Sequence, residues 1–314
     1  MGEPGTTKFQ TDLRRHLRQR GVERNLIRII CEISEASKYI INSIRTGDLG
    51  VAGTSNLYGE EQLALDVLSD RILQKRLKNS GVCASMVSEE NNDIIRFECG
   101  GGDCYSVAYD PLDGSSLVDV NLAVGTIISI YKGDNVLLRG REQVAAMYIL
   151  YGPRTTLVYS TGDGVHEFGM NQLMEYTLVQ ENVTIDGVGG IYSPGGQRNL
   201  YTSGTEKYVL SLEESGHKLR YSGGFVPDIN QILMKGRGIF MYPHLKGRPQ
   251  GKLRLLYELN PMAFLVEQAG GAASNGLMPI LDIEPDGIEM CAPVFIGCCE
   301  DVATAEKFIA EESV

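Results

Sequence analysis

The run Ser106-Val107-Ala108-Tyr109-Asp110-Pro111-Leu112-Asp113-Gly114-Ser115-Ser116 passes from a mainly apolar segment into two carboxylates and a small, hydroxyl-rich turn. Residues 106–109 predict a short buried strand, and Pro111 favours its end at Asp110 because a proline disfavours helix at the residue before it. Gly114 lets the chain turn sharply, and the amides of Ser115 and Ser116 can face an anion. The run therefore predicts hard oxygen ligands for a divalent cation beside a phosphate nest, as metal-assisted phosphate-ester hydrolysis requires. An Asp/Gly/Ser turn without a ligand is the alternative that the run alone leaves open.

Length and charge limit the class of protein. With 314 residues, 43% of them hydrophobic and 22% charged, the chain suits one large globular domain or two closely packed ones. The formal net charge of −11 argues against nucleic acid and against anionic membranes as partners. An anionic small molecule is not excluded, because bound metal and a few cations can reverse the field locally. No apolar run reaches membrane-spanning length and residues 1–20 carry no signal-peptide core, so we expect a cytoplasmic protein.

The seven cysteines are scattered and odd in number, which is typical of proteins from a reducing compartment. Cys99 and Cys104 flank the short loop 100–103 and are close enough in sequence for a disulfide, but we expect free thiols. The four histidines show no spacing typical of zinc ligands.

The apolar pattern predicts an α/β protein. Helical spacing spans 23–45 and 60–79, with a glycine-rich break between them. Short apolar runs then predict strands of a large, mostly antiparallel or mixed sheet at 84–88, 106–110, 123–131, 144–151 and 155–160. From about residue 193 the pattern alternates, with strands at 219–222, 238–242 and 294–297 and helices at 228–235, 253–269 and from 300 onward. We therefore divide the chain into subdomains 1–192 and 193–314, packed together.

Two further carboxylate segments are candidates for the same site. Glu89 and Glu90 follow the predicted strand 84–88. Glu258 lies in an otherwise apolar helix, where a buried carboxylate needs a partner or a metal. Adjacent glutamates alone are more often a solvated loop. Together with Asp110 and Asp113 at the ends of neighbouring strands, these residues predict a site for Mg²⁺ or Mn²⁺.

Cationic and phenolic residues are candidates for binding phosphate. Lys252 lies near the start of the helix that carries Glu258, where phosphate is favoured. Arg220, Tyr221 and Tyr242 lie beside turn residues, and their side chains suit phosphate oxygens. Each of these residues alone is more often a surface arginine or a tyrosine at a strand end.

In order and spacing, the segments Val87–Glu90, Asp110–Ser116 and Lys252–Glu258 resemble the class I fructose-1,6-bisphosphatase and sedoheptulose-1,7-bisphosphatase family, over nearly the whole chain from about Ile30. The resemblance implies a layered α/β sandwich that assembles as homodimers or homotetramers. It also implies hydrolysis of the 1-phosphate of a sugar bisphosphate with two or more Mg²⁺ ions per site, with Mn²⁺ as a substitute. The metal ligands that it implies are Glu89, Glu90, Asp110, the carbonyl of Leu112, Asp113 and Glu258.

The same resemblance implies roles for the remaining candidates. Asp66 acts with Glu90 to activate water, although an exposed helical aspartate is the usual reading of such a residue. Glu60 occupies the position of an acid on a mobile loop. The implied contacts of the cleaved phosphate are Asp113, Gly114, Ser115 and Ser116, and those of the sugar and far phosphate are Lys252, Tyr221, Tyr242, Arg198 and an Arg220 that reaches across from a neighbouring subunit.

The length of the substrate is a finer question. The segments 56–64, 117–121, 151–155 and 193–198 look more like the sedoheptulose enzymes, whereas 257–293 looks more like the fructose enzymes. Fructose enzymes place an Asn and a Tyr where this chain has Gly195 and Arg198; a glycine opens room and an arginine adds a bidentate donor. We therefore predict hydrolysis of sedoheptulose 1,7-bisphosphate to sedoheptulose 7-phosphate, with fructose 1,6-bisphosphate as the alternative. An inositol-phosphate phosphatase and a non-catalytic sugar-phosphate sensor fit the residues less well.

Two regulatory features of relatives are not expected in this chain. The plastid sedoheptulose enzymes carry a Cys pair in the segment that matches 49–55, and this chain has none there. The nucleotide loop of the AMP-inhibited fructose enzymes is not found in 11–30, and Cys104 stands where they have a lysine. We therefore expect neither thioredoxin switching at that segment nor AMP inhibition.

Overall fold

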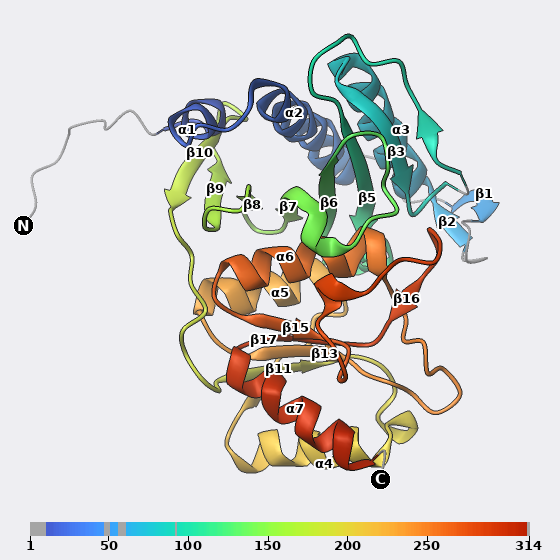
Figure 1. Ribbon diagram of the computed structural model, residues 1–314, viewed down its shortest axis with the longest axis vertical. Coiled ribbons are helices and arrows are strands. Elements are labelled where there is room, and N and C mark those ends of the chain that lie inside the picture. Colours follow the sequence, from blue (N-terminus) through green and yellow to red (C-terminus); the bar gives the residue numbers. More distant parts are fainter. Residues whose placement is uncertain (1–10, 47–50, 56–60, 92, 313–314) are drawn as a thin grey trace, which may run out of the picture.

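The layers of the protein alternate as helices, sheet, helices, sheet and helices from one end of the molecule to the other (Figure 1). The computed structural model describes residues 11–46, 51–55, 61–91 and 93–312. The predicted layered α/β sandwich is therefore confirmed. In the described residues, no helix is both long enough and apolar enough to cross a membrane.

An eight-stranded sheet forms the larger β layer, in the order β10-β9-β8-β7-β6-β5-β3-β4. Its pairs are antiparallel except β3 with β5, which run parallel. All the strands predicted between 84 and 160 are present, whereas β4, β9 and β10 were not predicted. The strands are β3 (Cys83–Ser88), β4 (Ile95–Arg96), β5 (Tyr105–Asp113), β6 (Val124–Lys132), β7 (Gln143–Tyr151), β8 (Thr155–Ser160), β9 (His166–Met170) and β10 (Tyr176–Gln180).

Helices α1 (Leu13–Gln19), α2 (Arg24–Thr46) and α3 (Ala64–Ser80) cover one face of this sheet (Figure 1). Helix α2 forms as predicted because its buried isoleucines and leucines recur at helical spacing. The second predicted helix starts later than expected, since β2 (Glu61–Leu63) pairs with β1 (Val51–Ser55) before the helix begins at Ala64. Asp66 consequently lies in the first turn of α3.

Helix α1, which the apolar pattern did not predict, is attached to the sheet through His16. Its Nδ1 lies 2.6 Å from the Tyr159 hydroxyl, and its Nε2 lies 2.8 Å from Oε1 of Glu181. The His166 ring packs edge-on against it, with centroids 4.7 Å apart, and both nitrogens of that ring bond to backbone groups. His16, His166 and Glu181 are close enough to hold a metal ion. Because every ring nitrogen already has a partner, we interpret the cluster as a hydrogen-bonded anchor.

Helices α5 (Phe225–Lys235) and α6 (Asn260–Gln268) lie between the two sheets and pack apolar side chains against both (Figure 1). The second sheet has the order β12-β11-β13-β17-β15. Helix α4 (Ser203–Glu214), which was not predicted, and α7 (Cys299–Glu312) cover its outer face. The strands are β11 (Ile191–Pro194), β12 (Lys218–Leu219), β13 (Ile239–Tyr242), β15 (Ala272–Ser274) and β17 (Val294–Gly297).

The division into subdomains 1–192 and 193–314 stays a prediction. The larger sheet ends with β10 and the smaller one begins with β11, so the chain changes sheets between residues 180 and 191. The predicted boundary falls slightly later, within β11.

The single helix predicted at 253–269 is divided into three parts. Strand β14 (Leu253–Arg254) pairs with β16 (Cys291–Ala292), a π-helical turn follows as η4 (Leu255–Leu259), and α6 begins at Asn260. Pro261 explains the break, because a residue without an N–H fits the first turn of a new helix and not the interior of an older one. Such π-turns often occur at functional sites, and this one carries Glu258.

Cys99 and Cys104 are joined in a disulfide, which corrects the expectation of free thiols at these two positions. Gly101 and Gly102 both adopt positive φ, so the loop turns sharply and brings the two Cα atoms to 6.3 Å. The other five cysteines are free, as expected.

Candidate functional site

A pocket of about 390 Å³ lies where β3 and β5 end and α5 begins. The parallel pairing of β3 with β5 brings the carboxyl ends of both strands to one edge of the sheet, and the Glu89 N–H donates to the Tyr109 carbonyl there at 3.1 Å. Most of the predicted site residues line this pocket. They are Asp66, Glu89, Glu90, Asp110, Leu112, Asp113, Gly114, Ser115, Ser116, Tyr221, Tyr242, Lys252 and Glu258.

Three buried carboxylates form the centre of the pocket. One oxygen from each of Asp110, Asp113 and Glu258 lies within 4.8 Å of the other two. In a regular strand, residues three apart point to opposite faces, but the register of β5 against β6 shifts between Asp110 and Asp113. This irregularity lets β5 present both carboxylates to one site. Glu258 joins them from η4, where its Oε2 accepts the Arg254 backbone N–H at 2.6 Å.

The electrostatics of these carboxylates indicate a cation site. In the metal-free protein, burial raises the pKa of Glu258 to about 8, and the charge of Glu89 adds to this rise. Burial raises the pKa of Asp113 to about 6, although backbone N–H groups at the start of α5 oppose the rise. Burial and then Glu89 raise the pKa of Asp110 well above its ordinary value. Such carboxylates are costly to ionise together, and a divalent cation offsets that cost, so the donor set fits a hard metal ion.

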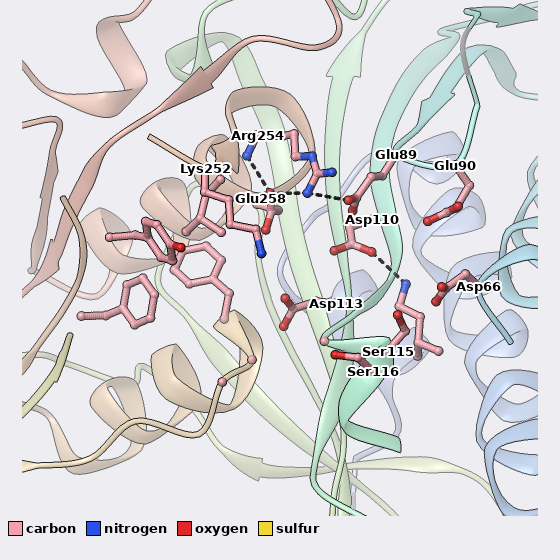
Figure 2. A pocket seen from close by; sticks show the side chains of 18 of the residues that line it. Asp66, Glu89, Glu90, Asp110, Asp113, Ser115, Ser116, Lys252, Arg254 and Glu258 are labelled. Atoms are coloured by element: carbon pink, nitrogen blue, oxygen red, sulfur yellow. Dashed lines mark hydrogen bonds and ion pairs between the residues drawn. The ribbon is translucent and has the colours of Figure 1, made fainter. Parts of the chain in front are cut away.

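Arg254 is a site residue that the sequence interpretation missed. Its side chain is buried, and Nη1 lies 2.7 Å from Oε1 of Glu89 and 4.0 Å from Oε2 of Glu258 (Figure 2). The guanidinium thereby holds a carboxylate from the end of β3 against one from η4. An arginine two residues after Lys252 in an apolar segment was the available signal, since a buried arginine requires a charged partner.

Asp66 and Glu90 form a second acidic group on the side of Asp110 away from Lys252 (Figure 2). Asp66 comes from α3, and Glu90 lies in the turn after β3. The structure therefore brings together the two residues expected to activate water. Glu60, the third predicted catalytic residue, lies outside the described residues.

The turn after Asp113 requires a left-handed backbone. Gly114 adopts φ 74°, a conformation that glycine takes without strain, and the chain can therefore reverse directly after the carboxylate. Beyond it, Asp113 Oδ2 accepts the Val226 N–H at 2.7 Å, which ties the start of α5 to the carboxylate cluster. Lys252 points toward the same carboxylates from the opposite wall (Figure 2).

Tyr221 and Tyr242 line the part of the pocket nearest the smaller sheet. Asp228 supports the Tyr221 loop from α5, because both of its carboxylate oxygens accept the Ser222 N–H, at 3.0 and 3.2 Å. Asp228 was not predicted, since a single helical aspartate gives no sequence signal.

Arg198, Arg220 and Gly195 are not among the described pocket-lining residues of their own chain. Arg198 Nη1 pairs with Oε1 of Glu213 at 2.8 Å, and Arg220 is exposed on the edge of the second sheet. A Cβ on Gly195 would lie 2.4 Å from Cδ2 of Tyr242, so the room that this glycine opens is filled by a tyrosine ring and not left for a longer substrate.

The arrangement can bind an anionic phosphate ester beside a divalent cation. Lys252, the η1 turn (Ser115–Val120) and the start of α5 supply positive charge or N–H groups, while the carboxylates supply metal ligands and an acceptor for a water proton. This combination suits phosphoryl transfer to water.

Two family models together match nearly the whole chain. The first, "Fructose-1-6-bisphosphatase, N-terminal domain", matches residues 6–181, and the second, for the C-terminal domain, matches residues 185–310. Among similar proteins, the class 1 fructose-1,6-bisphosphatase of Geobacter sulfurreducens is 69% identical over 98% of this chain and 98% of its own length. That of Syntrophotalea carbinolica is 68% identical over 99% and 98%.

Solved structures agree with this likeness. Fructose-1,6-bisphosphatase from Leishmania major matches with a TM-score of 0.90 and 31% identity, over 95% of this chain and 98% of that one. A Toxoplasma gondii protein, provisionally described as a sedoheptulose-1,7 bisphosphatase, matches with a TM-score of 0.88 and 28% identity, over 96% and 99%.

Proposed function

The chain belongs to the fructose-1,6-bisphosphatase family and is a sugar-bisphosphate phosphatase, and we propose that it hydrolyses the 1-phosphate of fructose 1,6-bisphosphate to give fructose 6-phosphate. The observation that carries this proposal is the buried cluster of Asp110, Asp113 and Glu258 beside Lys252, in a pocket that two tyrosines also line. The similar proteins are named as fructose-1,6-bisphosphatases, which supports fructose 1,6-bisphosphate as the substrate. They give less support to sedoheptulose 1,7-bisphosphate, the substrate that the sequence segments favoured.

The oxygen donors fit Mg²⁺, with Mn²⁺ as a substitute, and the carboxylate cluster together with Glu89, Glu90 and the Leu112 carbonyl would hold it. When bound, two or more such ions polarise the phosphoryl oxygens, lower the pKa of a water and neutralise the leaving oxygen. Arg254 keeps Glu89 in place and compensates its charge before the metal arrives.

Asp66, paired with Glu90, accepts one proton of the attacking water at a carboxylate oxygen. As the new P–O bond forms on one side of the phosphorus, the bond to the sugar oxygen breaks on the other, and that oxygen takes up a proton from solvent water. Because phosphoryl transfer needs little covalent work from a protein, the main task of the chain is positioning. Lys252 and the amides of Gly114, Ser115 and Ser116 perform it by binding the phosphate and the adjoining sugar. We assign the further acid role to Glu60, which lies outside the described residues.

The far phosphate is bound by Tyr221 and Tyr242, with Arg220 supplied by a second copy of the chain. Arg220 supports this assignment because it follows the edge strand β12, is exposed, and leads directly into Tyr221. A homodimer or homotetramer that packs this edge on its symmetry mate would complete the site. Arg198 lies near the same end and would act only after releasing Glu213.

Sedoheptulose 1,7-bisphosphate is the second candidate substrate. The likeness to the Toxoplasma gondii structure favours it, as do the segments 117–121 and 193–198. Two observations argue against sedoheptulose 1,7-bisphosphate. The Tyr242 ring fills the space at Gly195, and Arg198 forms an ion pair with Glu213.

Phosphate release from the two bisphosphates, measured side by side with Mg²⁺ and with excess chelator, tests the proposal. We expect a higher kcat/KM for the fructose compound and no release in chelator. A preference for the sedoheptulose compound would overturn the substrate, and release that survives exhaustive chelation would overturn the mechanism.

A further inference from the structure

We propose that Asp70 is a positioning residue that holds three carboxylate-bearing segments of the site in their working arrangement. The inference rests on the proposed phosphatase function. Asp70 lies on α3, outside the pocket lining, and is 5% exposed.

Three neutral donors converge on the Asp70 carboxylate. Its Oδ1 accepts the Tyr109 hydroxyl at 2.8 Å, and its Oδ2 accepts Nδ2 of Asn91 at 2.9 Å and Nε2 of Gln74 at 2.5 Å. Gln74 is one turn further along α3 and buttresses the carboxylate within its own helix. The other two donors come from elements that are distant from α3 in the sequence.

The contacts with Tyr109 and Asn91 each lead to a carboxylate of the site. Tyr109 immediately precedes Asp110 on β5, and Asn91 immediately follows Glu90. Asp70 itself is one helical turn after Asp66, so the two share one face of α3. Because successive strand residues point to opposite faces, Tyr109 reaches α3 while Asp110 faces the pocket. The Asp70 network therefore joins, from behind the sheet, the segments that carry Asp66, Glu90 and Asp110.

A carboxylate suits this position because the Asn91 and Gln74 amides share Oδ2 while the Tyr109 hydroxyl donates to Oδ1. An amide at residue 70 has the same shape but no charge and one accepting oxygen, so the hydrogen bonds lose their charge assistance and the Tyr109 hydroxyl must change from donor to acceptor. The attachment of the Tyr109 and Asn91 segments would then weaken. Residues that orient metal ligands without touching the metal typically change metal affinity or activity about 10–100-fold when altered.

The test compares wild type, Asp70→Asn and a control variant, Asp301→Asn. Asp301 is also a 5% exposed helical aspartate, on α7 beside His217 and outside the pocket lining. We expect Asp70→Asn to raise the Mn²⁺ dissociation constant, measured by EPR, about tenfold, and to lower kcat more than it raises KM. Asp301→Asn should lower only the thermal midpoint.

A swapped pair gives the sharper readout. Asp70→Asn combined with Asn91→Asp reverses the direction of one hydrogen bond, and we expect it to recover part of the Mn²⁺ affinity. If Asp70→Asn does not fold, Tyr109→Phe removes one donor at almost constant volume and should weaken Mn²⁺ binding by a smaller factor.

Wild-type Mn²⁺ affinity and kcat in the folded Asp70→Asn protein, or in Tyr109→Phe where that variant replaces it, would overturn the inference. A loss of stability equal to that of Asp301→Asn without a change in Mn²⁺ affinity would also overturn it, because the role would then be structural only. Failure of the proposed function gives a different result, since wild type itself would release no phosphate from fructose 1,6-bisphosphate.

Discussion

At the scale of single residues, the site is built from carboxylates that are unfavourable to bury together. Asp110, Asp113 and Glu258 are all buried, and Arg254 is the cation that contacts Glu89 at their edge. Burying these carboxylates together lowers the free energy of unfolding, as is common at functional sites. Among these residues, Glu258 has a pH consequence that can be measured, because burial raises its pKa to about 8.

Replacing Glu258 by Gln should remove both a metal ligand and a pH-dependent destabilisation. Its folded pKa of about 8 lies above the ordinary 4.5, so its contribution to stability is complete below about pH 4.5 and is lost as pH rises toward 8. Thermal unfolding of the metal-free proteins should therefore show a shallower decline with rising pH in Glu258→Gln than in wild type. Mg²⁺ should stabilise wild type far more than the variant.

Glu306→Gln is the matched control, since Glu306 lies on α7 and accepts a hydrogen bond from Ser274. It should keep the wild-type response to Mg²⁺. An equal pH slope in wild type and Glu258→Gln would show that Glu258 is not the group that titrates.

Asp228→Ala should weaken binding of the far phosphate without weakening binding of the cleaved one. The Ser222 N–H loses its carboxyl acceptor, and leaving such a donor unpaired costs about 1–3 kcal/mol, so the Tyr221 loop is released. KM for fructose 1,6-bisphosphate should rise at least about tenfold. KM for fructose 1-phosphate, which has no far phosphate, should stay unchanged. An equal rise for both compounds would place the effect at the carboxylate cluster instead.

Local patterns made the carboxylates and glycines of the site predictable, because Asp110–Ser116 and Glu89–Glu90 are short runs with direct chemical meaning. Arg254, Asp228 and Asp70 were missed because their roles depend on partners distant in the sequence or across an element boundary. Gly195 was misread for a similar reason: its neighbour Tyr242 is remote in sequence, so the glycine suggested space that a ring fills.

At the scale of elements, the two features that matter most are the division of 253–269 and the attachment of α1. The π-turn places Glu258 at the pocket, while α6 continues into the layer between the sheets. Helix α1 is held at the other end of the larger sheet by His16, whose ring packs against the buried His166.

The attachment of α1 should weaken in acid. Burial, followed by the nearby His16 and the Arg20 charge, lowers the pKa of His166 below the ordinary 6.5. The unfolded chain therefore binds this proton more readily than the folded one, and stability falls as pH drops below about 6.5 until the folded pKa is reached.

Thermal midpoints of wild type and His166→Asn between neutral and mildly acidic pH check this expectation. The groups facing the ring are His16, Arg20, Tyr159, Glu181 and the Asp163 carbonyl. The thermal midpoint of wild type should fall further in acid than that of His166→Asn. Parallel curves would contradict the assignment.

Strong periodicity made α2, α3 and the central strands predictable. The short α1, strand β9, the edge strand β10, and α4 were missed because their apolar positions are few or interrupted. The disulfide between Cys99 and Cys104 was underestimated because loop geometry, and not spacing, decides whether the thiols meet.

At the scale of the whole molecule, the site lies between the two β layers, and neither layer holds all of it. The larger sheet and α3, with the turns that follow them, supply the acidic residues Asp66, Glu89, Glu90, Asp110 and Asp113. The tyrosines come from the side of the smaller sheet, and the segment from Lys252 through β14 and η4 supplies Lys252, Arg254 and Glu258. Layer order and strand pairing could not be read from the sequence, since they depend on long-range contacts. The resemblance to a known family provided the layered architecture.

The most direct test of the central claim is metal-dependent phosphate release from fructose 1,6-bisphosphate by wild type and Asp113→Asn, with thermal midpoints measured in parallel. Asparagine can still accept the Val226 N–H but lacks the charge of a metal ligand. We predict that wild type yields fructose 6-phosphate only with Mg²⁺ or Mn²⁺. The variant should lose at least about 100-fold in turnover with a similar thermal midpoint, since residues that only support a ligand already cost about 10–100-fold. Near-normal turnover with unchanged metal dependence in Asp113→Asn would contradict the account.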